Sequence, residues 1–251
     1  NSGTMNPRGV RAVADLLAAE LEPLGFDVRW VPMPFPLQRA GHLIAERVGT
    51  RGKRLLLIGH LDTVFEEDSP FQTFERDGDV ARGPGVSDMK GGNVVIVQAL
   101  KALHEAGALD DVTVRVILTG DEENPGRPLD VARRDLIELA RQSDVALGFE
   151  AGSRSGDVEF GVVARRSSSG WTLRVEGTSA HSSGVFSQNV GAGAIFEAAR
   201  ILSRFYEEVR GDEYLTFNPG VILGGTDVVH DGEQNRGTAF GKTNVVAQTV
   251  V

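Results

Sequence analysis

Two almost entirely apolar runs, each followed at once by chemically reactive residues, constrain the fold most. They are "RLLLIGHLD" at residues 54–62 and "VTVRVILTGDEE" at residues 112–123. Apolar runs without alternation are typical of strands buried on both faces, as in the middle of a sheet. A helical pattern at 90–107 separates the two runs, and another at 127–143 precedes "DVALGFE" at 144–150, which we expect to be a short buried strand. This order predicts an α/β sheet with right-handed crossovers.

The flanking segments complete the predicted organisation. A helix is indicated at 6–25, where apolar residues recur at helical spacing, and two further strands follow it. Beyond residue 164 the pattern changes to an alternating strand, an amphipathic helix and another strand, at 167–181, 191–209 and 215–226. We therefore predict one α/β domain at residues 1–164 and a smaller α+β domain at residues 165–251.

Composition excludes several partners and several kinds of chemistry. The 26 basic and 35 acidic residues give a net charge of −9, which is the wrong sign for nucleic acid or an anionic membrane surface. There is no cysteine, so any metal must be bound by His, Asp or Glu. No apolar run approaches transmembrane length. We expect neither nucleic acid nor a membrane as a partner, and the compartment stays open between cytoplasmic and periplasmic or secreted.

Reactive side chains gather where the predicted strands end. They are His60 and Asp62 after the first run, Asp121, Glu122 and Glu123 after the second, Glu150 after the third, and Asp88 in the turn "GPGVSDMKGG" before a helix. Because the carboxyl ends of strands in an open α/β sheet meet at one edge, we expect these residues to converge. Imidazole and carboxylates without thiolates suit Zn²⁺, Mn²⁺ or Co²⁺.

Each residue of this set also has a local alternative. His60 and Asp62 are two apart and point to the same side of an extended chain, either as a metal ligand with an orienting carboxylate or as a hydrogen-bonded surface pair. Asp88 either bridges two cations or caps the following helix. A phosphate site at this turn is disfavoured, since the acid would repel an anion.

The two adjacent glutamates point in different directions in extended geometry, which favours two separate roles. One of Glu122 and Glu123 would ligate a metal while the other acts as general base, and the alternative is an acidic turn in solvent. Asp121 is interpreted as a structural neighbour, and Glu150 alone would be an ordinary strand-end acid. Four loops that each supply a hard ligand favour the metal site.

Five motifs in this order carry a family resemblance: "GHLDTV", "GPGVSDMKGG", "TGDEE", "ALGFE" and "GTSAHSSG". The chain resembles the aminoacylase and glutamate-carboxypeptidase family of dizinc metallopeptidases (peptidase clan MH), and within it the glutamate carboxypeptidase-like branch. The resemblance covers nearly the whole chain. It implies a phosphorylase/hydrolase-like mixed sheet flanked by helices, which forms the catalytic domain, and an inserted smaller α+β lid and dimerisation domain.

The resemblance also implies roles for individual residues. Two divalent metal ions, zinc before cobalt or manganese, would be held by His60, Asp88, Glu123 and Glu150, with Asp88 bridging both. Glu122 resembles the general base and Asp62 the acid that orients His60. His181 resembles the histidine that reaches the partner subunit's active site to hold the substrate carbonyl or oxyanion, and Asn244 a substrate-binding position. Without the family context, His181 would be a satisfied surface histidine and Asn244 a local cap.

Two departures from the family pattern affect these expectations. The segment "NPGRP" follows the Glu pair where relatives carry a Gly-Ser-containing turn, which puts the substrate specificity in question. The family's last metal ligand is a histidine near the C-terminus, and neither His181 nor His230 has its context. We therefore expect the 251 residues to be a piece of a longer chain, lacking part of the first helix and the end of the smaller domain. Alone they would not complete a two-metal site, and we expect them to be inactive.

The predicted function is metal-dependent hydrolysis of an amide or peptide bond in a small peptide or N-acyl amino acid with a free carboxylate, by a homodimer formed through the smaller domain. A catalytically silent dimeric binding homologue is the alternative, and a phosphate- or nucleotide-binding protein is a more distant one. The remaining histidines look structural: His42 in a strand pattern, His104 in the last turn of a helix, and His230 in a polar surface loop near the substrate entrance.

Overall fold

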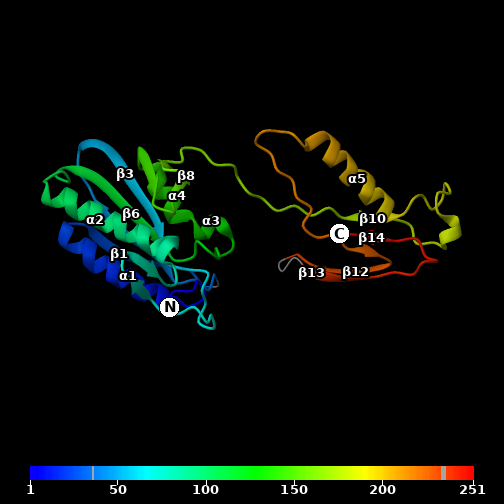
Figure 1. Cartoon of the computed structure of the whole chain (residues 1–251), viewed down its shortest axis with the longest axis horizontal. Helices are drawn as coiled ribbons and strands as arrows, with labels where there is room; N and C mark the ends of the chain where they lie inside the picture. Colours follow the sequence, from blue (N-terminus) through cyan, green and yellow to red (C-terminus); the bar gives the residue numbers. More distant parts are fainter. Residues whose placement is uncertain (36, 233–235) are drawn as a thin grey trace. The chain divides into compact units, whose positions relative to one another are not determined.

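The computed structural model describes residues 1–35, 37–232 and 236–251. They form two compact units, Asn1–Val162 and Val163–Val251 (Figure 1). This boundary is close to the division expected at residue 164, and the functional roles assigned to the two parts remain predictions. No helix of the described chain is long and apolar enough to cross a membrane.

A five-stranded mixed sheet forms the centre of the first unit, in the order β1-β2-β6-β3-β7. Its strands are β1 (Asp27–Pro32), β2 (Gly41–Arg47), β3 (Arg51–His60), β6 (Val112–Thr119) and β7 (Val145–Gly148). β3 pairs in parallel with β6 and with β7, whereas β2 runs antiparallel to β1 and to β6. The predicted α/β class, with a mixed sheet flanked by helices, is confirmed.

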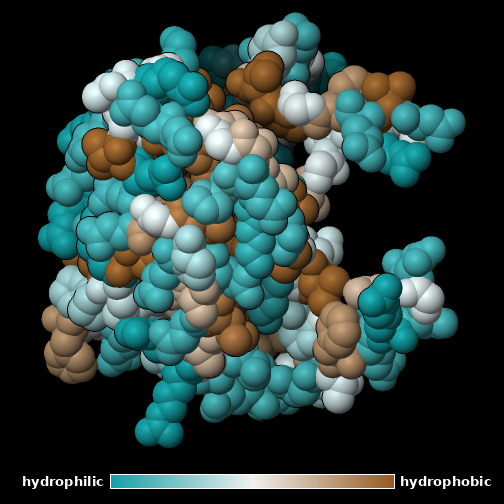
Figure 2. All heavy atoms as spheres, turned by 90° about the vertical axis from the view of Figure 1, so that its left-hand side faces the viewer, coloured by the Kyte–Doolittle hydropathy of each residue, from teal (hydrophilic) through white to brown (hydrophobic). Residues whose placement is uncertain are grey.

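Helices cover both faces of this sheet. Because successive residues of a strand point to opposite faces, neighbouring residues enter different cores. The helices are α1 (Pro7–Leu21), α2 (Gly91–Glu105), α3 (Leu129–Ala132) and α4 (Arg134–Arg141). Leu57 belongs to the core that α1 and α2 cover, while its neighbour Leu56 packs with Leu139 of α4 in the core on the other face. This double burial explains why the β3 run is apolar without alternation. Hydrophilic side chains predominate on the face shown in Figure 2.

The first helix begins and ends as its sequence predicts. Asn6 caps α1, accepting a hydrogen bond from the Gly9 N–H at 3.0 Å, and Pro7 occupies the first helical position, where its missing N–H is tolerated. After the short turn η1 (Glu22–Leu24), Gly25 takes a left-handed conformation with φ of 80° and stops the helical path.

Two expectations for this unit were wrong in detail. The helix predicted at 127–143 is interrupted at Arg133, whose φ of −105° and ψ of 4° are not helical, so it forms α3 and α4. The strand predicted at 144–150 forms as β7 but is exposed throughout rather than buried. In the described part of the chain it is the outermost strand of the sheet, next to β3 only. Short hairpins complete the unit: β4 (Glu75–Asp77) with β5 (Val80–Arg82), and β8 (Ser153–Ser155) with β9 (Val158–Phe160).

The second unit is built around one helix and short antiparallel strands. Its elements are β10 (Val175–Glu176), η3 (Ser182–Gly184), α5 (Ala194–Val209), β11 (Gly224–Gly225), β12 (Asp227–Asp231), β13 (Arg236–Phe240) and β14 (Thr249–Val250). β10, β14 and β11 form one sheet, and β12 pairs with β13. Ala194 and Ala198 of α5 pack on Val175 and Val250 in a small core.

The two long strands predicted in the second unit were wrong in extent. Within 167–181 and 215–226, only Val175–Glu176 and Gly224–Gly225 form ladder pairs among the described residues. One apolar residue of each segment instead joins an aromatic cluster: Trp171 stacks on Phe217 with ring centroids 4.3 Å apart, and Phe205 of α5 lies edge-on to both. At Trp171 and Phe217, side-chain packing rather than strand pairing therefore accounts for the apolar positions.

We predict that Leu56→Ala lowers the free energy of unfolding of the first unit by about 2–5 kcal/mol, because Leu56 is 0% exposed and its truncation leaves a cavity between β3 and α4. Urea unfolding followed by circular dichroism measures this change. The matched control is Leu16→Ala in α1, where the side chain is 71% exposed and the expected change is within about 0.5 kcal/mol. Equal effects of the two substitutions would contradict the core assignment.

Candidate metal centre

The three parallel strands end side by side and bring their following loops together. In the β3–β6 pair His60 lies opposite Thr119, and in the β3–β7 pair Ile58 lies opposite Gly148. The segments that follow carry Asp62, the Glu122–Glu123 pair and Glu150. The expected convergence at the carboxyl edge of the sheet therefore follows directly from the strand register.

Two glycines let the start of α2 approach this edge closely enough to add Asp88. A Cβ at Gly59 of β3 would lie 2.4 Å from the side-chain oxygen of Asn93 and 2.8 Å from the Met89 Cε. A Cβ at Gly92 would lie 2.0 Å from the carbonyl oxygen of Phe149, the residue before Glu150. Only residues without a side chain permit this contact, so these glycines bring the turn η2 (Val86–Lys90) beside both strand ends.

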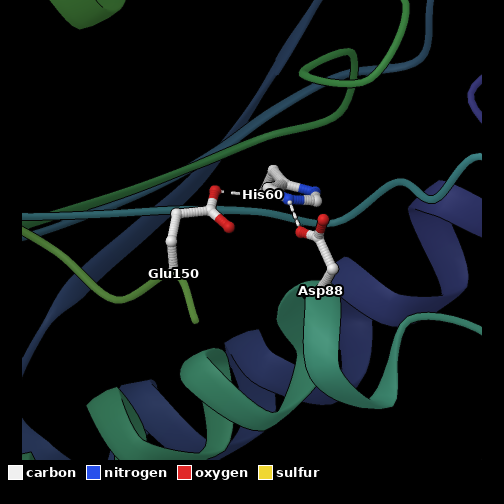
Figure 3. A group of neighbouring side chains, drawn as sticks. All are labelled: His60, Asp88 and Glu150. Atoms are coloured by element: carbon white, nitrogen blue, oxygen red, sulfur yellow. Dashed lines mark hydrogen bonds and ion pairs between the residues drawn. The ribbon is translucent and has the colours of Figure 1, made fainter. Parts of the chain in front are cut away.

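His60, Asp88 and Glu150 form a compact group whose ligand atoms all lie within 4.8 Å of one another. The His60 Nε2 is 2.9 Å from Asp88 Oδ1 and 3.4 Å from Glu150 Oε1. Figure 3 shows the ring between the two carboxylates, one from the turn before α2 and the other from the loop after β7. The imidazole is buried, whereas the Asp88 and Glu150 side chains are 60% and 44% exposed, so the group opens to solvent on its acidic side.

The spacing of this group fits a divalent cation. Ligands of a tetrahedral zinc ion lie about 2.0–2.2 Å from the metal, which puts two of them about 3.4 Å apart. The His60–Glu150 separation of 3.4 Å has this value, and the His60–Asp88 separation of 2.9 Å is a hydrogen-bond distance that would need to open slightly. Asp88 is exposed enough to make that adjustment.

The charges around His60 favour a cation at its Nε2. Burial alone lowers the pKa of His60, but the hydrogen bond and charge of Asp62, the hydrogen bond of Asp88 and the charge of Glu150 raise it to about 9. Carboxylates that stabilise a proton on this ring will also stabilise a metal ion bound by it.

Asp62 is a fully buried carboxylate that connects three segments of the site. Its oxygens accept hydrogen bonds from the Thr4 hydroxyl at 2.7 Å, the Glu122 N–H at 3.0 Å and the Glu123 N–H at 3.1 Å. Its Oδ1 is also 3.4 Å from the His60 Nδ1, although that nitrogen lies closer, at 3.0 Å, to the Asp62 carbonyl oxygen. Burial raises the pKa of Asp62, but the hydrogen bonds from His60, Thr4 and the Glu122 N–H, together with the charge of His60, outweigh burial and lower it, so the group stays ionised.

The two glutamates of the pair lie in different surroundings. Glu123 is half-buried, and burial, followed by the charge of Asp88, raises its pKa. Glu122 is exposed. Burial also raises the pKa of Glu150, and the charge of Asp88 adds to that effect. Such crowding of acids is what a bound cation would relieve, although Glu123 is not a member of the compact three-residue group within the described chain.

Asp121 was interpreted as a structural neighbour, and its contacts are with the polypeptide around it. It is 0% exposed and accepts hydrogen bonds from Arg133 at 2.7 Å and from the Gly126 N–H at 2.9 Å. Sequence reasoning missed Arg133 and Thr4 as partners of the acidic residues. No local sequence pattern reveals either pair, because Thr4 is 58 residues from Asp62 and Arg133 is 12 residues from Asp121.

The candidate residues of the second unit lie next to each other within that unit. His181 forms an antiparallel bridge with Val245, and the Ser182 N–H donates to the Asn244 carbonyl oxygen at 2.9 Å. The His181 Nδ1 accepts from the Ser183 N–H at 3.2 Å, so a neutral ring carries its proton on Nε2. His230 was predicted in a surface loop, but it lies in strand β12, paired with Gly237 of β13. The roles of His181 and Asn244 remain predictions.

Comparisons with a family, with two relatives and with a crystal structure agree with one another. Residues 56–247 match Peptidase family M20/M25/M40. Carboxypeptidase G2 from Pseudomonas sp. (strain RS-16) is 38% identical over 166 residues, covering 62% of this chain and 37% of that protein. Succinyl-diaminopimelate desuccinylase from Novosphingobium aromaticivorans is 36% identical over 179 residues, covering 68% of this chain and 46% of that protein. The crystal structure of aminopeptidase PepT from Bacillus cereus covers 100% of this chain and 61% of its own, with a TM-score of 0.63 and 18% identity.

Fold and site define an α/β protein with a candidate divalent-metal centre at the carboxyl edge of its sheet. The chain belongs to Peptidase family M20/M25/M40, a family of metal-dependent hydrolases, and the resemblance predicted from the five motifs is confirmed. The chain spans less than half the length of the two relatives named above. The likeness to the aminopeptidase structure, at 18% identity, supports the fold alone.

We predict that Zn²⁺ raises the melting temperature of the chelator-treated protein and that His60→Gln abolishes this shift, since His60 is the buried member of the three-residue group. At a free-metal concentration of 100 times the Kd, binding adds about 2.7 kcal/mol of stability. Differential scanning fluorimetry with and without Zn²⁺ measures the shift. His104→Gln, at the exposed end of α2, is the control and should keep it. A shift that His60→Gln retains would mean that the ion binds elsewhere, and a shift lost in both variants would mean that the loss is not specific to His60.

Proposed function

We propose that the protein hydrolyses an amide or peptide bond in a small substrate with a free carboxylate, such as a C-terminal amino acid of a peptide or an N-acyl amino acid. The observation that supports this most is the His60–Asp88–Glu150 group next to two backbone-tethered glutamates, in a chain of this family. Relatives named as a carboxypeptidase, a desuccinylase and an acetylornithine deacetylase support amide cleavage in small carboxylate-bearing molecules.

The proposed cofactor is a pair of divalent ions, zinc first and cobalt or manganese next. His60 and Glu150 would hold one ion, Glu123 would contribute to the second, and Asp88 would contact both, since it lies 2.9 Å from the His60 Nε2 and its charge raises the pKa of Glu123. When bound, such ions polarise the scissile carbonyl and lower the pKa of the attacking water. Asp62 contributes by fixing the His60 ring and the backbone of the Glu pair.

Glu122 is the proposed general base. Its backbone N–H donates to Asp62, which fixes the backbone, while its side chain is exposed. The carboxylate is therefore accessible to water and substrate. It accepts a proton from the attacking water and passes it to the leaving amine. Glu123 is more buried and is influenced by Asp88, which suits a ligand better than a base.

His181 of a partner subunit is proposed to hold the substrate carbonyl and the oxyanion that develops from it. Its Nδ1 is occupied by the Ser183 N–H, which leaves Nε2–H as a donor. Asn244, adjacent to His181 through the Ser182 contact, is proposed to bind the substrate. The role of His181 requires a homodimer, which we propose to form through the second unit.

We expect Glu122→Gln in the full-length protein to retain its metal and to lose a factor of about 10²–10⁴ in kcat, which is the usual contribution of a general base. Glu123→Gln should instead lose bound metal, because it removes a ligand charge. Elemental analysis and hydrolysis of a panel of dipeptides and N-acyl amino acids measure both. Wild-type kcat in Glu122→Gln would refute the base assignment. Metal binding by the wild type without turnover of any panel member would favour a silent binding homologue.

A mixing experiment tests the role of His181. Glu122→Gln and His181→Ala are each expected to be nearly inactive, since the loss of one oxyanion donor typically costs about 10²–10³ in kcat. Mixed dimers contain one site with both residues intact when His181 serves the partner's site. Activity should therefore reappear after the two variants are unfolded and refolded together. No recovery, with mixed dimers present by mass spectrometry, would place His181 in its own subunit's site or outside catalysis.

A further inference from the structure

The segment between β6 and α4 carries Glu122 and Glu123, and two buried polar connections tie its start to its end. The start is Gly120–Asp121, directly after β6, and the end is Ala132–Arg133, directly before α4. Neither connection involves the residues of the compact metal-binding group. Asp121 lies in the motif "TGDEE" without an assigned catalytic or metal-binding role, and His42 and Arg133 lie outside the five motifs.

The first connection is an ion pair reinforced by a backbone contact. Arg133 donates from Nη1 to Asp121 Oδ1 at 2.7 Å and from Nη2 to the Asp121 carbonyl oxygen at 2.9 Å. The second carboxylate oxygen of Asp121 accepts from the Gly126 N–H at 2.9 Å. Asp121 is 0% exposed and the Arg133 side chain 16%, so the pair lies in a largely water-free environment. A planar guanidinium is suited to hold two acceptors at once.

The second connection is made by His42, the second residue of β2. The ring is 0% exposed, its Nδ1 accepts from the Gly120 N–H at 3.3 Å, and its Nε2 lies 3.0 Å from the Ala132 carbonyl oxygen. An amide N–H can only donate and a carbonyl can only accept, so the ring carries its proton on Nε2. His42 thus links the residue before Asp121 to the residue before Arg133.

Burial of a charged pair is by itself a poor source of stability. Taking both charges out of water offsets most of their attraction, and apolar replacements of similar volume are often neutral or stabilising. What a fully bonded buried network supplies is a unique geometry. Here that geometry is imposed on the residue immediately before Glu122, whose own N–H and that of Glu123 are held by Asp62. The Glu pair is therefore fixed from two sides.

We propose that His42, Asp121 and Arg133 form a positioning latch that sets the place of Glu122 and Glu123 at the metal centre. This inference rests on the proposed function, in which Glu122 moves a proton and Glu123 binds metal. None of the three latch residues is a catalytic residue, because each acts through the backbone of the Glu pair. Catalytic groups displaced by about 1 Å can lose a factor of about 10² in rate, so a latch of this kind has a measurable effect.

The test is the double variant Asp121→Asn with Arg133→Met in the full-length protein, which removes both charges and leaves Asn able to accept from Gly126. Its melting temperature should stay close to that of the wild type, since no unpaired charge remains. We expect kcat to fall at least about 10-fold with KM changed less than about 3-fold, because the reacting geometry is lost and the substrate contacts are kept. Zn²⁺ titration calorimetry, which needs no turnover, should show weaker binding of the ion that Glu123 holds and unchanged binding at His60 and Glu150.

Arg134→Met is the matched control, because Arg134 is the next residue, its side chain is 55% exposed and its nearest acid is 3.9 Å away. Arg133→Lys is measured in parallel, so that the decision does not depend on the folding of the double variant; lysine keeps the charge but lacks the planar guanidinium whose two nitrogens donate to the carboxylate and carbonyl oxygens of Asp121. It should lower kcat and weaken Zn²⁺ binding in the same direction. Latch variants with kcat and Zn²⁺ affinities equal to those of Arg134→Met would overturn the inference. A wild type that neither binds Zn²⁺ nor hydrolyses the panel would instead contradict the proposed function.

Discussion

The candidate centre depends on one buried carboxylate. Asp62 is fully enclosed, yet it stays ionised because a hydroxyl, two backbone N–H groups and an imidazole surround it. Through these contacts it fixes the His60 ring and the backbone of both glutamates. His60 and the Glu pair are therefore held by the same carboxylate before a cation binds, which reduces the rearrangement that binding requires.

Most of the fold of the first unit, and the convergence of three candidate metal ligands at one edge of its sheet, could be predicted from the sequence. The apolar runs that end at His60 and Thr119 lack the alternation of a half-exposed strand, which predicts inner strands, and their residues enter cores on both faces of the sheet. Once those strands were placed in parallel, geometry required the residues after them to converge. The grouping of His60, Asp88 and Glu150 follows from that register together with the close approach allowed by Gly59 and Gly92.

What could not be predicted depends on contacts between distant segments. His42 looks like any strand histidine until β2 is known to begin beside Thr119, and Arg133 looks like a helix-surface residue until α3 and α4 are seen to part there. The exposure of β7 reflects its place at the sheet edge rather than its composition. In the second unit, the alternation around Trp171 reflects an aromatic cluster, and periodicity alone does not distinguish such a cluster from a ladder.

The hydroxyl of Thr4 makes the first few residues of the described chain part of the site rather than a peripheral tail. Gly3 bridges Thr63 and the Thr4 hydroxyl reaches Asp62, so the segment before α1 is laid against the loop that follows β3. Trimming that segment during protein engineering would remove a hydrogen bond from the buried carboxylate of Asp62 and, through it, disturb the placement of His60.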